Sequence, residues 1–207
     1  MEVLKYLLVI VCGYLIGSLS MSIIVSRTVM GEDVRQKGSG NAGATNMARV
    51  FGMKAGVFTL IGDMAKAGLT MLIGWLLLRD GGLAAGGMAC IVGHCFPVYY
   101  GFKGGKGVSV GAAVALALDW RVFAAAIAVF LLVAFISKKV SLGSMCAAVT
   151  IMVTAFIFHL STPKIILAVA APLLVIFQHR ENIKRLINGT EKDFKPAKKG
   201  MKKQKEN

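Results

Sequence analysis

Long apolar runs are the feature that most constrains the fold of this chain. An α-helix needs about 20 consecutive apolar residues to cross the hydrocarbon core of a bilayer. The 207-residue sequence holds seven candidate segments, at 3–25, 55–78, 83–100, 108–118, 122–136, 142–160 and 165–177. Runs of this length predict an all-α fold, a polytopic transmembrane helical bundle with about seven spans.

The number of spans depends on segments 108–118 and 122–136, which are short and separated only by residues 119–121. They could instead form one long helix or a shallow hairpin. The positive-inside rule favours separate spans, because a fused helix would place the lysine pairs at 103/106 and 138/139 on opposite faces. With seven spans and the N-terminus outside, four Lys and Arg residues lie outside and nineteen inside, with Lys66 within a span. The same rule places the C-terminus in the cytoplasm.

Charge and composition exclude several classes of protein. The net charge is +14, but the basic residues form short clusters between apolar runs and a dense tail, so we expect no nucleic-acid partner. Hydrophobic residues make up 56% and charged residues 16%, which excludes disorder over most of the length. The four cysteines lie in apolar runs without zinc-type spacing, so we interpret them as packing residues.

A single domain is expected over residues 1–194, followed by a basic cytoplasmic tail at 195–207 that contacts anionic lipid. The first apolar run is too long for a signal peptide and lacks a strongly basic start, so we interpret it as a retained helix. Gly13 and Gly17 have the small-xxx-small spacing that predicts close helix packing.

The first polar segment that packing does not explain is the Gly-rich run 38–46, followed by Arg49. Alternating glycines can take positive φ and direct several N–H groups into one concavity, which suits an anion. Arginine adds a planar fork suited to phosphate. The alternative is a flexible polar loop with a helix N-cap at Thr45 or Asn46. We favour phosphate binding.

The second segment is 93–107, in which Lys103 and Lys106 flank a glycine pair. It is not a nucleotide-binding P-loop, because Gly107 stands where that motif needs Ser or Thr. Taken alone, the lysines fit ordinary positive-inside flanking. His94 lies near a helix end, where a structural hydrogen bond and a chemical role are equally open.

The third segment, 179–191, predicts a short interfacial helix that ends at Gly189. His179 and Asn182 are three residues apart and therefore share a face. The alternative is a basic amphipathic anchor. Within the second apolar run, Asp63 and Lys66 either line a site or form a structural ion pair.

These three segments, in this order among apolar helices, resemble the acyl-phosphate-dependent glycerol-3-phosphate acyltransferases of bacteria, the PlsY family. The resemblance covers residues 3–191, and the three motifs together are highly specific although each alone is weak. Ala67 stands where the family pattern has Gly, and Ser109-Val110 stands where it has Ala-Thr.

The resemblance implies transfer of a long-chain acyl group from acyl phosphate to the 1-hydroxyl of glycerol 3-phosphate, giving lysophosphatidic acid and phosphate. This is the first step of phospholipid synthesis. Acyl-CoA and acyl carrier protein are not direct donors, and in agreement no His is followed five residues later by Asp. It also implies a multi-pass protein of the bacterial inner membrane, with its active site on the cytoplasmic side.

Site residues are carried over from the family motifs. The catalytic residues would be Lys106, His179 and Asn182, and the substrate-binding residues would be Ser39, Gly40, Asn41, Gly43, Asn46, Arg49, His94, Lys103, Gly104 and Gly105. The general base is either His179 or the phosphate of the donor. We expect no metal, because the donor groups are cations and amides, and we expect no cofactor and a monomer.

Two other classes fit parts of the sequence. A transporter for a phosphorylated solute could use the same anion-binding loops, but it predicts charged groups through the bilayer depth and broken helices in related halves. A lipid-binding scaffold would account for the basic tail, but it gives no reason for the two Gly-rich loops.

Overall fold

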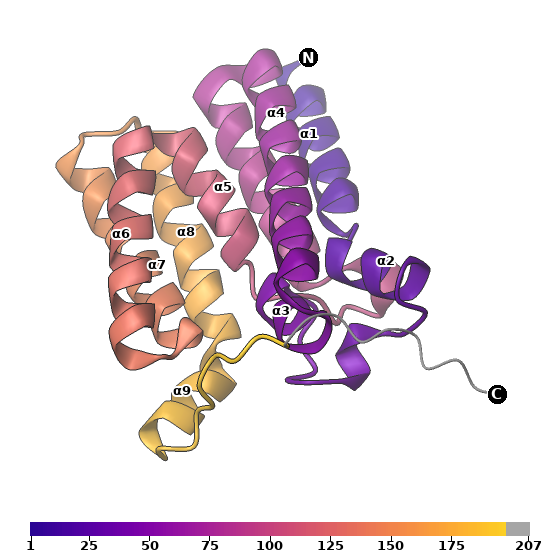
Figure 1. Cartoon of the computed structure of the whole chain (residues 1–207). Coiled ribbons are helices and arrows are strands. Elements are labelled where there is room, and N and C mark those ends of the chain that lie inside the picture. The colour runs from indigo at the N-terminus through magenta and orange to yellow at the C-terminus, as the bar shows by residue number, and fades with distance from the viewer. Residues whose placement is uncertain (198–207) are drawn as a thin grey trace.

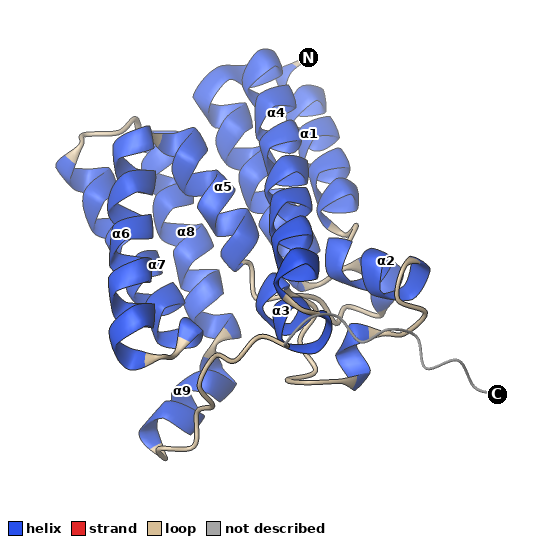
Figure 2. Cartoon of the chain, viewed as in Figure 1, coloured by secondary structure: helices blue, strands red, loops and turns tan. Residues whose placement is uncertain are grey.

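The computed structural model of the chain describes residues 1–197, and in this part every regular element is a helix (Figure 2). The α-helices are α1 (Glu2–Gly17), α2 (Met21–Thr28), α3 (Ala44–Phe51), α4 (Met53–Cys95), α5 (Val108–Leu118), α6 (Trp120–Ser137), α7 (Val140–Ile157), α8 (Thr162–Gln178) and α9 (Arg180–Ile187). Two short 3-10 helices are η1 (Val34–Gln36) and η2 (Val98–Tyr100).

Helix α4 consists of two limbs joined at Leu78 and Arg79, whose backbone is not helical. The limbs correspond to the predicted segments 55–78 and 83–100. They fold back closely on one another, because a Cβ added at Gly74 would lie 2.1 Å from the carbonyl oxygen of Gly82. The second limb ends before Pro97, a residue that disfavours helical geometry in the residue preceding it.

The prediction of one continuous helix over residues 3–25 is wrong, because the chain breaks between α1 and α2. The carbonyl oxygens of Gly17 and Leu19 would accept from later residues in a continuous helix, but here both accept hydrogen bonds from Lys66. The predicted close packing at Gly17 is confirmed, since a Cβ there would lie 2.3 Å from the Cys90 carbonyl oxygen.

Segments 108–118 and 122–136 form two separate helices, so the alternative of one long helix is wrong. Extended backbone at Asp119 ends α5, and the Asp119 carboxylate accepts from the Arg121 N–H at the start of α6. With 11 residues, α5 is only about 16 Å long, which is shorter than the apolar core of a bilayer.

Four helical stretches of the described chain are individually long and apolar enough to cross a membrane, at Glu2–Thr28, Met53–Tyr100, Trp120–Ser137 and Val140–Ile157. A fifth results if α8 and α9, which are bent by 56°, count as one broken span. Helical segments occupy all seven predicted positions, and the count of seven stays a prediction.

The polar loops gather at one end of the bundle. Figure 1 shows α2, α3 and α9 together at this end, with the N-terminus at the opposite end. The main apolar core lies between α4, α5, α6, α7 and α8. The side of the membrane on which the polar loops lie stays a prediction.

Candidate functional site

A cavity of about 1220 Å³ opens among the polar loops and continues between the helices. The first limb of α4 lines it on one side, α6 and α7 line it on the other, and residues of α5 and α8 also border it. Residues from all three polar sequence segments reach it. The cavity therefore unites segments that lie far apart in the sequence.

The polar end of the cavity is strongly cationic. Among residues 1–197, one carboxylate, that of Glu191, lines it together with five cationic side chains, those of Arg49, Lys106, Lys138, Arg185 and Lys192. An excess of positive charge in a partly enclosed site favours anions with more than one negative charge, such as phosphate esters.

The first loop is shaped by glycine and by Asn46. Gly38 and Gly40 have positive φ, as predicted, whereas Gly43 is extended. The Asn46 amide donates to the carbonyl oxygens of Val34, Lys37 and Asn41, and its Oδ1 accepts from the Ser39 N–H at 2.9 Å. Asn46 is buried, and its hydrogen bonds fix the conformation of the loop. The Ser39 N–H is therefore not available to a ligand.

Helix α3 begins at Ala44 with Gly43 as its N-cap, so the alternative N-cap at Thr45 or Asn46 is wrong. This helix brings Arg49 to the cavity. No hydrogen bond or ion pair engages the Arg49 guanidinium within residues 1–197, so its donors are available to a ligand.

The second loop folds over His94. The N–H groups of Gly104 and Gly105 donate to the carbonyl oxygens of Cys95 and His94. These glycines therefore shape the loop and do not line the cavity. Lys106 lines the cavity, whereas Lys103 is exposed and lies outside the lining.

Arg35 joins the first loop to the second. Its guanidinium forms an ion pair with Asp33 and donates to the carbonyl oxygens of Tyr100 and Lys103. The two arginine partners of Asp33, Arg35 and Arg27, hold the pKa of that carboxyl well below its usual range. Sequence reasoning did not single out Arg35, because an arginine in a polar loop has no spacing signature.

Asn182 connects Lys106 to Glu191. Its Oδ1 accepts a hydrogen bond from Lys106, and its Nδ2 donates to Glu191 at 2.6 Å. Glu191 also accepts from Ser141 at 2.6 Å and from Arg185 at 2.7 Å. Burial raises the pKa of Glu191, but these donors outweigh it and lower the pKa overall. The carboxylate is therefore charged at neutral pH.

Lys106 combines positive charge with burial. Burial lowers its pKa to about 8, and the nearby charge of Arg185 contributes in the same direction. The ammonium is therefore the form present at neutral pH, and it loses its proton when the pH rises above about 8.

His179 follows the last residue of α8 and lines the cavity. Its Nδ1 lies 2.7 Å from the carbonyl oxygen of Val175. A carbonyl oxygen can only accept, so Nδ1 carries the hydrogen and Nε2 keeps a lone pair. A neutral His179 can therefore accept a proton at Nε2.

The other end of the cavity is apolar. Residues of α6 line it, including Phe123, Ile127, Phe130, Leu131 and Phe135. Leu131 and Phe135 are also largely exposed although they line the cavity, so this arm of the cavity is open and not enclosed by the helices.

The predicted site residues divide into two groups. Those that line the cavity are Ser39, Asn41, Gly43, Asn46, Arg49, His94, Lys106, His179 and Asn182. Those that do not are Gly40, Lys103, Gly104 and Gly105. Sequence reasoning did not assign Lys138, Ser141, Arg185, Glu191 or Lys192 to the site, although Arg185 and Glu191 lie within the third motif.

The chain after Glu191 runs from α9 toward α3 (Figure 1), and Lys192 and Phe194 line the cavity. The Phe194 N–H donates to the Lys138 carbonyl oxygen, and the Ala197 N–H donates to that of Ala48. Most of the predicted basic tail, 198–207, lies outside the described residues.

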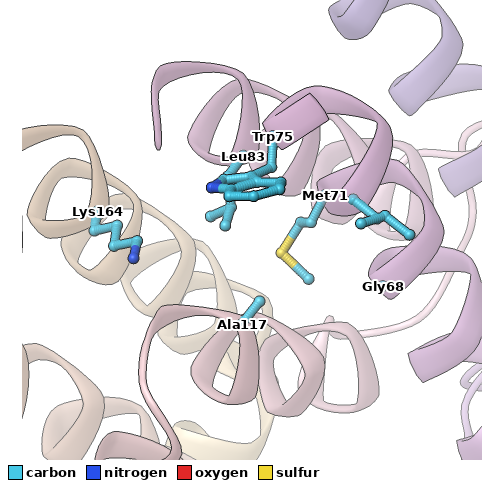
Figure 3. A pocket seen from close by; sticks show the side chains of 7 residues that line it. Gly68, Met71, Trp75, Leu83, Ala117 and Lys164 are labelled. Atoms are coloured by element: carbon cyan, nitrogen blue, oxygen red, sulfur yellow. The ribbon is translucent and has the colours of Figure 1, made fainter. Parts of the chain in front are cut away.

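A second cavity of about 300 Å³ shares no residue with the large one (Figure 3). Its lining is mostly apolar, with Trp75, Met71 and Leu83 of α4 facing Ala117 and Lys164. Lys164 lies 3.6 Å from Asp80, which partly balances its charge. No group of this cavity takes part in the polar site.

Comparison with known proteins gives one consistent result. The family model described as glycerol-3-phosphate acyltransferase matches residues 7–189. Proteins named glycerol-3-phosphate acyltransferase are similar to this chain. That of Syntrophotalea carbinolica is 40% identical, covering 92% of this chain and 98% of the relative, and that of Bacillus subtilis is 38% identical, covering 91% and 97%.

A solved structure is similar as well. It is a crystal structure of PlsY (YgiH), an integral membrane glycerol 3-phosphate acyltransferase, in its glycerol 3-phosphate form. The TM-score is 0.87 at 33% identity, with 92% of this chain and 96% of the other covered.

Proposed function

The chain belongs to the glycerol-3-phosphate acyltransferase family, and from this premise we propose that its acyl donor is a long-chain acyl phosphate. The acceptor is the 1-hydroxyl of glycerol 3-phosphate, and the products are lysophosphatidic acid and inorganic phosphate. The enzyme is an acyltransferase of the first step of phospholipid synthesis.

One observation carries this proposal, namely that a single cavity has a cationic end and an apolar arm. Both substrates bring a phosphate group, which five cationic side chains at the polar end can neutralise. The acyl chain is apolar and suits the arm along α6, where it could enter directly from the bilayer.

The reaction forms one ester bond and breaks one acyl–phosphate bond. The 1-hydroxyl oxygen attacks the carbonyl carbon of the donor, the C–O bond to phosphate breaks, and phosphate leaves with the bonding electrons. Lys106 and Arg49 stabilise the negative charge that develops on the oxyanion and on the leaving phosphate. Since no Ser-His-Asp arrangement was found in the sequence, we expect direct transfer without an acyl-enzyme.

The hydroxyl proton has two possible acceptors. The Nε2 lone pair of His179 is one, because its Nδ1 is engaged by the Val175 carbonyl oxygen. The phosphate of the donor is the other, since phosphate esters have a second pKa of about 6. A loss of only a few-fold in activity in His179→Ala would assign the proton to the phosphate.

The test is release of phosphate from palmitoyl phosphate by the purified protein, with and without glycerol 3-phosphate. Release that depends on glycerol 3-phosphate, with lysophosphatidic acid formed in equal amount, would support the proposal. Equal turnover with acyl-CoA or acyl carrier protein would overturn the donor assignment. EDTA should leave the rate unchanged, because the proposal uses no metal.

Two lysines of one loop provide a matched pair of variants for this assay. Lys106→Met removes a cation from the cavity and should lower kcat/KM roughly 10- to 100-fold, the effect of losing a hydrogen bond to a charged group. Lys103→Met changes an exposed side chain outside the cavity and should alter it less than about twofold. Equal losses would contradict the placement of the phosphate groups.

A further inference from the structure

A buried polar cluster beside the large cavity contains two charged residues, Asp63 and Lys66, that have no part in the reaction as described so far. It consists of Asp63 and Lys66 on the first limb of α4 and His94 on the second. Asp63 is fully buried, Lys66 is 8% exposed and His94 is 2% exposed. Burying ionisable side chains within a membrane span is energetically unfavourable, and such residues usually have a functional role.

Lys66 is at the centre of the cluster. Its Nζ lies 2.9 Å from the Asp63 carboxylate, which balances its charge. It donates to the carbonyl oxygens of Gly17 and Leu19 at 2.9 and 2.6 Å, and it lies 3.2 Å from Nδ1 of His94. One ammonium thus links the end of α1 to both limbs of α4.

The contact with Lys66 determines which nitrogen of His94 carries the hydrogen. An ammonium group can only donate, so Nδ1 of His94 must accept and Nε2 must carry the hydrogen. The Asp63 oxygen does not offer an alternative, because at 3.6 Å from Nδ1 it is too far for a hydrogen bond.

The Nε2 atom of His94 lies on the side of the second Gly-rich loop. A Cβ added at Gly105 would be 2.2 Å from it, and the next residue is Lys106. His94 also accepts the Gly105 N–H through its carbonyl oxygen and lines the large cavity. Nε2 therefore packs against the glycine that precedes Lys106, at the edge of the cavity that His94 and Lys106 line.

We propose that Lys66 is a positioning residue for acyl transfer, which holds His94 in the tautomer that presents an Nε2–H donor to a phosphate oxygen in the cavity. His179 is the counterpart, because its Nδ1 donates to Val175 and its Nε2 keeps the lone pair. The two histidines thus present opposite hydrogen-bonding character to one cavity. The role of the donor rests on the proposed function, whereas the tautomer does not.

The tautomer can be measured in the unmodified protein. The chain has three histidines, so protein labelled with ¹⁵N-histidine in lipid nanodiscs gives three pairs of ring nitrogens. His94→Gln identifies the His94 pair by its disappearance. We expect a hydrogen on Nε2 and a bare Nδ1 in the wild type, and loss of this preference in Lys66→Met. A hydrogen on Nδ1 in the wild type would overturn the proposal, even if Lys66→Met failed to fold.

Kinetics then separate positioning from simple structural support. Gln places an amide N–H near the ε position of His, whereas Asn places one near the δ position. His94→Gln should therefore keep more activity than His94→Asn. Lys66→Met should lower kcat/KM roughly 10- to 100-fold in the wild type and by only a few-fold in the His94→Gln background.

Equal losses from Lys66→Met in both backgrounds would mean that Lys66 supports the fold alone, and would overturn the positioning role. A failure of the positioning role can be distinguished from a failure of the proposed acyl donor. If acyl phosphate were not the donor, the wild type would show no turnover with it, while the His94 nitrogens would still show the hydrogen on Nε2.

Discussion

At the scale of single residues, the site depends on side chains whose hydrogen-bonding roles are determined by neighbours. Asn182 is the clearest case, because Lys106 can only donate to it and the Glu191 carboxylate can only accept from it. The orientation of its amide follows from these two contacts. Glu191 therefore contributes to the site through Asn182, without being a catalytic residue itself.

Glu191→Gln should lower kcat/KM about tenfold or more. One carboxylate oxygen becomes an N–H₂ group, so either Arg185, which donates to Oε2, or both Ser141 and Asn182, which donate to Oε1, lose their acceptor. The control is Glu181→Gln, because Glu181 is an exposed residue of α9 that within residues 1–197 pairs with Lys184 alone and does not line the cavity. Steady-state kinetics with purified variants tests this, and similar losses in both would contradict it.

The activity should fall as the pH rises above about 8. Burial lowers the pKa of Lys106 to about 8, so its positive charge is present below this pH and lost above it. The pH profile of kcat/KM for glycerol 3-phosphate measures this effect. In Lys106→Arg the cation persists, because a guanidinium does not titrate in this range. If kcat/KM of Lys106→Arg fell above pH 8 as it does in the wild type, the fall would not be due to loss of the Lys106 charge.

At the scale of elements, glycine residues let helices pack so closely that their backbones are in contact. The two limbs of α4 meet at Gly74 and Gly82, and α1 meets the second limb at Gly17. Close contact of this kind is a means of association for helices in lipid, where the hydrophobic effect does not drive them together. The positions of Lys66 and His94 on adjacent limbs follow from it.

Gly74→Ala should destabilise the protein by about 1–3 kcal/mol, because the new methyl group would lie 2.1 Å from a backbone oxygen that cannot move independently. Gly68→Ala is the matched control in the same limb, since a Cβ there meets nothing within 4 Å. Thermal unfolding in detergent should show a lower Tm for Gly74→Ala only. Comparable Tm values for the two variants would argue against close packing of the limbs.

At the scale of the whole molecule, three polar segments from distant parts of the chain form one end of the bundle (Figure 1). The small cavity of Figure 3 lies apart from them and carries none of the site. The substrate glycerol 3-phosphate is water-soluble and the acyl chain is not, which suits a site between a polar end and an open, apolar arm.

The polar end should face the cytoplasm. Basic residues are concentrated in its loops, which the positive-inside rule places on that side. A green fluorescent protein fused to the C-terminus should therefore fluoresce, and alkaline phosphatase fused at the same point should be inactive. The reverse pattern would place the site outside and invert the predicted topology.

The sequence by itself determined the helical membrane fold, the separate helices on either side of Asp119 and the three segments that form the site. These depend on local properties, namely the length of apolar runs, glycine spacing and charge. It did not reveal the break after Gly17, where the freed carbonyl oxygens accept from Lys66, a residue about 50 positions later.

Only the tertiary structure decided which polar residues share the cavity and in what state. It separated Lys106 from Lys103, joined Glu191 to Asn182 and placed Lys66 against His94. The physical reason is that hydrogen bonds between distant segments leave no periodicity in the sequence. They arise only when the packed helices bring a donor and an acceptor within about 3 Å of one another.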